Sequence, residues 1–251
     1  MAAPDWLITE PDAFEDYDLG PLKGGKEAEI FVIERVCGER FCLLAHKRYR
    51  PRMVSTKGEL QALDFQRPAA FVNDHAYRAG RRIPDSRARR AVERNTRFGR
   101  TVSAEVWAGE EWKMLCRLAG GGVRVPYPVA RTADGLLMQF LGDRSGAAPS
   151  LAAARLSPAD AEGAARMVVE DLYRMVGGGV VHADLSAHNI LWWEGQTWII
   201  DVPQAVDLAV NVDAFDFLVR DLRNIGSWFN RHSVAFDAEA LFTKLLASLS
   251  P

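Results

Sequence analysis

The chain has 251 residues, with 31 Lys and Arg against 33 Asp and Glu, and a formal net charge of −2. That length suffices for one large domain or two lobes, and the near-neutral charge gives no global argument for a nucleic-acid or membrane partner. No apolar run reaches the roughly 20 residues of a membrane span. The N-terminus lacks a signal-peptide pattern. Three cysteines without metal spacing suggest small core residues of a reducing compartment, so we expect a cytoplasmic protein with no membrane association.

The first 50 residues are predicted to form a loose acidic lead over 1–18 followed by β-structure. Two glycines open the stretch 22–33, whose alternating residues predict a turn between two strands. Glycine backbone can approach phosphates closely and neighbouring lysines add charge, but the stretch is not GxGxxG, and the residues alone favour a plain hairpin turn. The candidate phosphate-loop residues are Lys23, Gly24, Gly25 and Lys26. Residues 40–49 are predicted to be a third strand.

Residues 67–100 differ in character from the rest of the chain, with about ten Arg against three acids. They lie within a predicted insert that spans about 52–102. Such a segment could contact an anionic partner, either RNA or an acidic protein, or could simply be a solvated basic stretch. Aromatic residues are sparse here, which gives little support to base stacking.

Four further elements are predicted before the polar motif. Residues 103–118 have a helical apolar face, with Ser103 as the N-cap and glycines after the helix. Residues 135–142 predict a buried strand, and the Gly/Ala/Pro/Ser-rich stretch 143–157 predicts a linker. A helix over 158–175 starts with Pro at its first position.

Polar residues then gather around a short strand and a hairpin. Val180 and Val181 predict the strand, and residues 189–200 predict a hairpin that turns at about 194–196. Asp184 and Asn189 lie on the loop that enters the hairpin, and Asp201 follows it, so we expect these three side chains to converge.

That set of side chains suits phosphoryl transfer. The reaction needs a carboxylate to orient the nucleophile and hard oxygen ligands for Mg²⁺, and an Asp, an Asn five residues later and an Asp after a hairpin supply them. The alternative is a capped loop in which Asp184 and Asn189 bond local backbone.

The motif resembles the RIO family of atypical protein kinases. His182-Ala183-Asp184-Leu185-Ser186 with Asn189, then Ile200-Asp201-Val202 with Gln204, match the family's His-Ala-Asp-Leu-Ser-x-x-Asn and Ile-Asp-x-x-Gln. Ordinary kinases have His-Arg-Asp and Asp-Phe-Gly there. The resemblance runs from about residue 22 to 229, apart from the insert. Two departures are Lys23-Gly24 in the phosphate loop, where the family has Ser-Thr, and Pro203 and Ala205, where it has Ser.

The resemblance implies a role for each candidate residue. Asp184 would orient the nucleophile, and Asn189 and Asp201 would hold Mg²⁺, with Mn²⁺ as the alternative metal. Lys47, oriented by Glu111, would hold the phosphates of ATP, with Arg48 and Glu110 as the neighbouring alternatives. The adenine would bind the strand at the start of the interlobe connection, near Met138, Phe140 and Leu141.

The expected fold is α+β: a two-lobed, protein-kinase-like fold with a truncated C-terminal lobe. Residues 1–141 would form a mainly β lobe and 142–251 a mainly helical one, including a helix over 212–229. About 50 residues follow Asp201, without an Ala-Pro-Glu motif or a long activation segment. RIO kinases fit that pattern, and their action as ATPase switches through a phosphorylated aspartate would place that group on Asp201.

Three functions remain open from the sequence. The first is a RIO-like Ser/Thr protein kinase or ATPase. The second is a small-molecule phosphotransferase of the aminoglycoside or choline kinase type, which also uses His-x-Asp, Asn and a later Asp. The third is a nucleotide-gated module that binds RNA or a protein through the Arg-rich segment.

Overall fold

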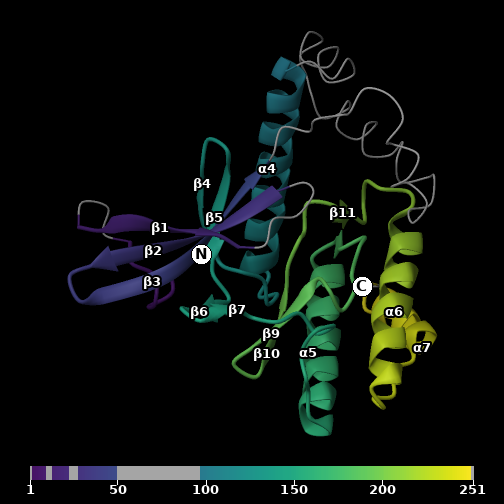
Figure 1. The fold of residues 1–251 in the computed structure, drawn as a ribbon. Coiled ribbons are helices and arrows are strands. Elements are labelled where there is room, and N and C mark those ends of the chain that lie inside the picture. The colour runs from purple at the N-terminus through teal and green to yellow at the C-terminus, as the bar shows by residue number, and fades with distance from the viewer. Residues whose placement is uncertain (1, 10–12, 23–27, 50–96, 250–251) are drawn as a thin grey trace, which may run out of the picture.

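The computed structural model describes residues 2–9, 13–22, 28–49 and 97–249, with backbone only for 97–106. Its first part is a five-stranded antiparallel sheet with the strand order β1-β2-β3-β5-β4. The strands are β1 (Glu15–Pro21), β2 (Ala28–Cys37), β3 (Arg40–Tyr49), β4 (Pro128–Arg131) and β5 (Gly135–Gln139). Helix α4 (Arg97–Gly120) packs against β3, β4 and β5, as Figure 1 shows.

The second part is mainly helical. Its elements are β6 (Gly142–Asp143), β7 (Gly146–Ala147), α5 (Pro158–Gly177), β8 (Val180–Val181), β9 (Ile190–Trp193), β10 (Gln196–Ile199), β11 (Val206–Asp207), α6 (Ala214–Arg231) and α7 (Ala238–Ala247). Helices α6 and α7 pack on each other, and α5 packs on β8 and β10 (Figure 1). The predicted α+β class is therefore confirmed.

The start and end of α5 follow from its sequence. The Ser157 side chain accepts a hydrogen bond from the Asp160 amide, which caps the helix, and Pro158 occupies the first turn, where no amide donor is needed. The helix ends at Gly177, the first of three consecutive glycines. Its buried face, which includes Val168, Leu172 and Val176, belongs to the main apolar core.

Two separate apolar cores hold the fold together. The main core extends from Leu115 in α4 to Leu245 in α7 and surrounds the loops that carry the candidate site. A smaller core lies on the other face of the sheet, where Leu7 and Ile8 cover Cys42 and Leu44 of β3. Among the described residues, no helix combines the length and apolar character that crossing a membrane requires.

Three expectations about element boundaries were wrong. Residues 1–18 are not a loose lead: Leu7 and Ile8 are buried, and Glu15 already pairs with β2. The side chains of β1 are almost all exposed, so its acidic composition conceals a strand held by backbone pairing and by the Arg35–Asp16 ion pair (2.7 Å).

Helix α4 begins at Arg97 instead of Ser103, so Ser103 is not its cap. Helix α6 begins at Ala214, two residues after the predicted start. Helix α7 has no counterpart among the predicted elements, although Asp237 caps it by accepting from the Ala240 amide.

Candidate active site

The hairpin of β9 and β10 positions Asn189 and Asp201. Its pairing ends at Ile190 opposite Ile199, and the Ile200 amide then donates to the Asn189 carbonyl (3.0 Å). Asn189 and Asp201 therefore leave the ladder at the same end. The turn at the other end is the two-residue loop Glu194-Gly195, both with positive φ (48° and 73°), a backbone that matches the twist of paired strands.

Asn189 also orders the loop that carries Asp184. Its amide nitrogen donates to the Asp184 carbonyl (2.8 Å) and lies 3.5 Å from the Asp184 carboxylate. Asn189 thus makes the local backbone bond that the capped-loop alternative describes, and the same bond places Asp184 beside Asn189. Within the described ranges the Asn189 amide oxygen accepts no hydrogen bond, which leaves a hard oxygen donor for a metal.

His182 joins the start of this loop to the end of the hairpin. It is buried, and its Nε2 lies 3.0 Å from the carbonyl oxygen of Ile200. Burial lowers the pKa of His182, so the ring is neutral and Nε2 carries the hydrogen that it donates. Its role is to hold the loop in place.

Asp221 is a site residue that the sequence analysis did not single out. It lies on the buried face of α6, and its carboxylate accepts from the amides of Ala183 (2.7 Å) and Leu185 (3.0 Å), on either side of Asp184. The Arg220 guanidinium donates to the Ala183 carbonyl. These bonds fix a backbone in which Ala183 has a φ of 64°, a conformation that non-glycine residues rarely adopt.

Lys47 lies between Glu111 and Asp201. Its ammonium nitrogen is 2.7 Å from Glu111 Oε1 and 2.9 Å from Asp201 Oδ1. Lys47 and Glu111 are buried, whereas the side chain of Asp201 is 43% exposed. Burial lowers the pKa of Lys47, but the two carboxylates outweigh it and hold that pKa above its ordinary value, so the lysine is charged.

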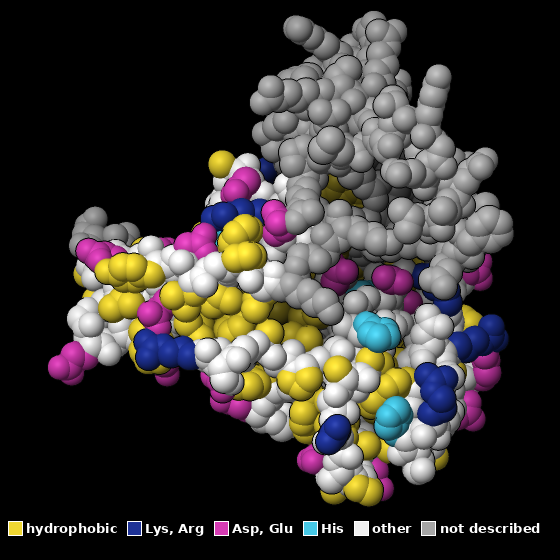
Figure 2. Space-filling view, viewed as in Figure 1, with side chains coloured by type: hydrophobic (Ala, Val, Ile, Leu, Met, Phe, Trp, Pro, Cys, Tyr) yellow, Lys and Arg dark blue, Asp and Glu magenta, His cyan; other side chains and the backbone are white. Residues whose placement is uncertain are grey.

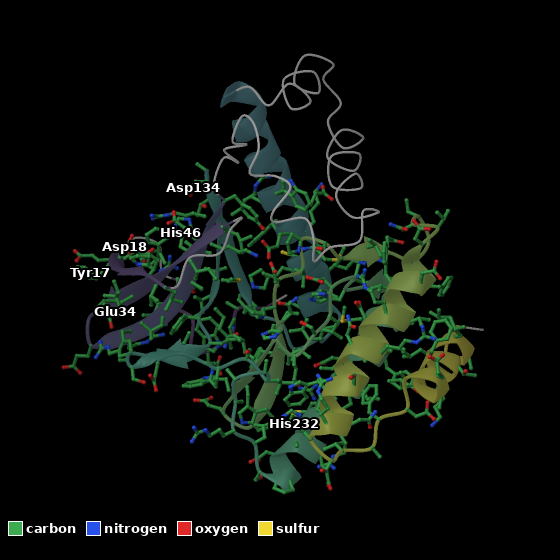
Figure 3. All side chains as sticks on the ribbon, turned by 45° about the vertical axis from the view of Figure 1, so that its right-hand side comes forward. Tyr17, Asp18, Glu34, His46, Asp134 and His232 are labelled. Atoms are coloured by element: carbon green, nitrogen blue, oxygen red, sulfur yellow. The ribbon has the colours of Figure 1, made fainter. Side chains whose placement is uncertain are left out.

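The alternation of β3 separates Lys47 from its neighbours. Arg48 and His46 point to the opposite face of the sheet, where Arg48 Nε donates to His46 Nδ1 (3.1 Å) and pairs with Asp134 (3.4 Å). Figure 3 shows His46 and Asp134 near each other in the sheet region, away from α6 and α7.

The two candidate glutamates of α4 also differ. Glu110 pairs with Lys113 on the surface (3.2 Å), while Glu111 is 3% exposed and contacts Lys47. The Tyr49 hydroxyl donates to the second carboxylate oxygen of Glu111, and the Val202 amide also bonds this carboxylate. The sequence analysis did not identify Tyr49 as part of the site, because its partner Glu111 is distant in sequence.

The three candidate adenine residues follow one another from β5 but have different surroundings. Met138 packs against the main core, and Leu141 is buried. Phe140 lines a cavity of about 570 Å³ together with Leu43 and Gln139. Figure 2 shows apolar side chains gathered on the molecular surface below the sheet.

The remaining candidates cannot be placed. Lys23, Gly24, Gly25 and Lys26 lie outside the described residues, as does the Arg-rich segment up to residue 96. The side chains of Arg97 and Arg100 are also outside the described part.

The oxygen donors at the hairpin end fit a magnesium ion. Asn189 offers an amide oxygen and Asp201 a partly exposed carboxylate, and Mg²⁺ binds through one or two such ligands while keeping waters and phosphate oxygens. No cluster of three or more His, Cys, Asp or Glu suited to a metal occurs in the described ranges, so an all-protein metal cage is not seen there. A carboxylate, a two-ligand metal position and a buried lysine together suit transfer of a phosphoryl group from a nucleotide.

Comparison with known proteins points to the same chemistry. A family model described as the RIO domain matches residues 71–241, about two thirds of the chain. The match includes Glu111, Asp184, Asn189 and Asp201 and begins after Lys47, whose placement therefore depends on geometry.

Relatives that carry RIO names come from archaea and eukaryotes. The chain is 31% identical over 158 residues to the RIO-type serine/threonine-protein kinase Rio1 of Thermoplasma acidophilum, covering 61% of this chain and 82% of the relative. It is 29% identical over 230 residues to Rio1 of Haloferax volcanii, covering 89% and 67%. It is 36% identical over 132 residues to the human serine/threonine-protein kinase RIO1, covering 52% of this chain but only 23% of that protein.

The sheet with its packed helix, the helical part and the loop between β8 and β9 agree with the kinase-like fold of this group. With the family match over most of the chain and an archaeal relative covered over most of its length, this chain belongs to the RIO family.

Proposed function

We propose that this chain is an ATP- and Mg²⁺-dependent atypical serine/threonine protein kinase of the RIO type, which acts as an ATPase when the phosphoryl group ends on water instead of on a hydroxyl acceptor. The observation that carries the proposal is the buried Lys47, bonded at once to Glu111 and Asp201. A lysine so fixed suits the phosphates of a nucleotide bound between a lobe of residues 1–141 and a lobe of 142–251.

Each polar side chain has a part in the proposed reaction. Lys47 binds phosphate oxygens, and Glu111 fixes its position. Asn189 and Asp201 hold the metal, which neutralises charge that builds up on the phosphates. Asp184 accepts a hydrogen bond from the acceptor hydroxyl and aligns it with the phosphorus, while Asn189 keeps the Asp184 loop in place.

The proposed acceptor of the phosphoryl group is a protein hydroxyl. The names of the relatives favour a protein serine or threonine as this acceptor over a small cationic molecule. The charge of the segment 67–100 supports an acidic protein or RNA as the partner that it contacts. Asp201 is the proposed acceptor in the ATPase reaction: its carboxylate oxygen forms a bond to the γ-phosphorus, ADP leaves, and water then releases phosphate.

The test is ATP turnover by the purified chain with Mg²⁺, counting free phosphate and phosphate retained on protein separately. Asp184→Asn and Asp201→Asn should each lower turnover at least 100-fold. Asp216→Asn, the same substitution at an exposed acid of α6, should keep it within twofold. Retained label that hydroxylamine releases supports the aspartyl route, and stable label on Ser or Thr supports the kinase route. Turnover that survives both site substitutions would refute the assignment of the site.

A further inference from the structure

Arg117, on the last turns of α4, makes two bonds to the helical part of the chain. Its Nη1 is 2.7 Å from Asp207 Oδ2, and its Nη2 donates to the Gly178 carbonyl (2.7 Å). The other oxygen of Asp207 accepts from the Ala209 amide (2.8 Å), so both oxygens of this carboxylate are held. Each of the two terminal nitrogens of the guanidinium thus makes its own bond. The single ammonium nitrogen of a lysine cannot reproduce this geometry.

These two bonds reach the segments on either side of the catalytic residues. Asp207 lies in β11, six residues after Asp201, and β11 pairs with β8 through Asp207 opposite Val180. Strand β8 leads directly into the loop of Asp184. Gly178 lies between α5 and β8, so Arg117 contacts the entry to the Asp184 loop and the exit from Asp201 together.

The chain is shaped to let the arginine approach. Gly179 has a φ of 73°, and a Cβ atom there would lie 3.0 Å from Arg117 Nη2. The Leu208 amide donates to the Gly179 carbonyl (2.9 Å), which holds this glycine next to β11. A larger residue at this position would push the guanidinium away.

Helix α4 therefore has two attachments to the segment that follows Asp201. The first is Glu111, which contacts Lys47 and the Val202 amide. The second is Arg117, six residues or roughly 9 Å further along the helix. Together with the packing of α4 on the sheet and on the main core, these two polar contacts define how the helix is turned about its axis.

The Arg117–Asp207 ion pair is too exposed for its main contribution to be to the stability of the fold. The side chains of Arg117 and Asp207 are 43% and 32% exposed, and ion pairs in contact with solvent add little to the free energy of folding. Arg117 lowers the pKa of Asp207, so the carboxylate stays charged and the bond persists at neutral pH.

We propose that Arg117 is a positioning residue that, through Asp207 and Gly178, holds α4 in the place where Glu111 keeps Lys47 against Asp201. The inference rests on the proposed phosphoryl transfer, because the reaction uses the position of Lys47. Arg117 touches no reacting atom and acts through Glu111.

Two measurements on the full chain test the proposal. The first is amide hydrogen exchange of residues 107–120, which needs no activity. Arg117→Ala should raise exchange there at least tenfold, and Arg117→Lys should have an intermediate effect. Lys113→Ala is the matched control on the same helix, since Lys113 is exposed and, among the residues that the structure describes, forms its ion pair with Glu110; it should leave exchange unchanged.

The second measurement is the kinetics of ATP turnover in a double-mutant cycle. Arg117→Ala should lower kcat about tenfold in the wild-type background and less than twofold in a Glu111→Gln background, because its effect passes through Glu111. A merely structural role would lower kcat by the same factor in both backgrounds.

The outcomes are distinct. Unchanged exchange in Arg117→Ala, a kcat within twofold of wild type, or equal factors in the two backgrounds each overturn the proposal. A wild-type chain without turnover would instead overturn the proposed function, and the exchange measurement would still decide whether Arg117 holds α4.

Discussion

Replacing Asp221 probes how α6 holds the loop that carries Asp184. Asp221→Ala removes the acceptor of the Ala183 and Leu185 amides, and each buried donor left without a partner costs about 1–3 kcal/mol. We expect a loss of about 2–6 kcal/mol in the free energy of unfolding. Asp221→Asn keeps one acceptor oxygen and should cost about 1–3 kcal/mol at acidic pH.

The pH dependence of that cost gives a sharper test. Burial raises the pKa of Asp221 to about 7 in the folded protein, from a model-peptide value of about 3.9. As pH rises from about 4 to 7, the unfolded chain loses this proton while the folded chain keeps it, so unfolding becomes easier. The group's contribution is complete below pH 4 and falls by about 4 kcal/mol by pH 7. Asn does not titrate, so the cost of Asp221→Asn should shrink as pH rises.

Urea unfolding followed by tryptophan fluorescence at pH 4.5, 6 and 7.5 measures this trend, with Asp216→Asn as an exposed control in the same helix. Turnover by Asp221→Asn should fall about 10- to 100-fold at neutral pH, because the loop of Asp184 loses part of its support. A cost that grows with pH would refute the reasoning, since it would mean that the folded protein favours the ionised carboxylate. A cost below about 0.5 kcal/mol for Asp221→Ala would refute the anchoring role.

Three further substitutions test the site and the core. Glu111→Gln removes one of the two carboxylates around Lys47 and should lower ATP turnover tenfold or more with an unchanged circular dichroism spectrum; turnover within twofold of wild type would contradict the assignment. Asn189→Ala removes one of the two proposed metal ligands and should raise the Mg²⁺ concentration for half-maximal turnover about 10- to 100-fold, whereas an unchanged midpoint would exclude Asn189 as a ligand. Leu222→Ala, at a fully buried position of α6, should cost about 2–5 kcal/mol in urea unfolding, and a cost under about 1 kcal/mol would show that the core collapses around the gap.

Local signals account for the parts of the structure that the sequence predicted. The hairpin of residues 189–200 depends on neighbouring β-branched and aromatic residues and on a Glu-Gly turn, all within one short stretch. Helix α5 likewise has its N-cap and its terminating glycines at its own ends. Such elements are visible because their causes lie next to one another in the chain.

Other parts depend on partners far away in sequence. The sequence of strand β1 predicts an acidic lead instead of a strand, because β1 pairs with β2 through its backbone and buries few apolar side chains. Asp221 gave one local signal, since it lies on the same helical face as Leu218 and Ile225, and an acid on an apolar face needs a buried partner. Nothing local identified the Ala183 and Leu185 amides as that partner, because they are 38 and 36 residues away.

The two-residue turn of the β9–β10 hairpin is a position where this chain should tolerate inserted residues. Adding one residue within either strand would move every following side chain to the other face and would carry Asp201 away from Asn189. Adding residues at Glu194-Gly195 would leave the paired register intact, because that loop lies at the end of the hairpin opposite Asn189 and Asp201 and Glu194 is exposed. A fluorescent label or a short epitope inserted there should therefore keep the strand register, and related sequences of different length should differ at this turn and keep the strands constant.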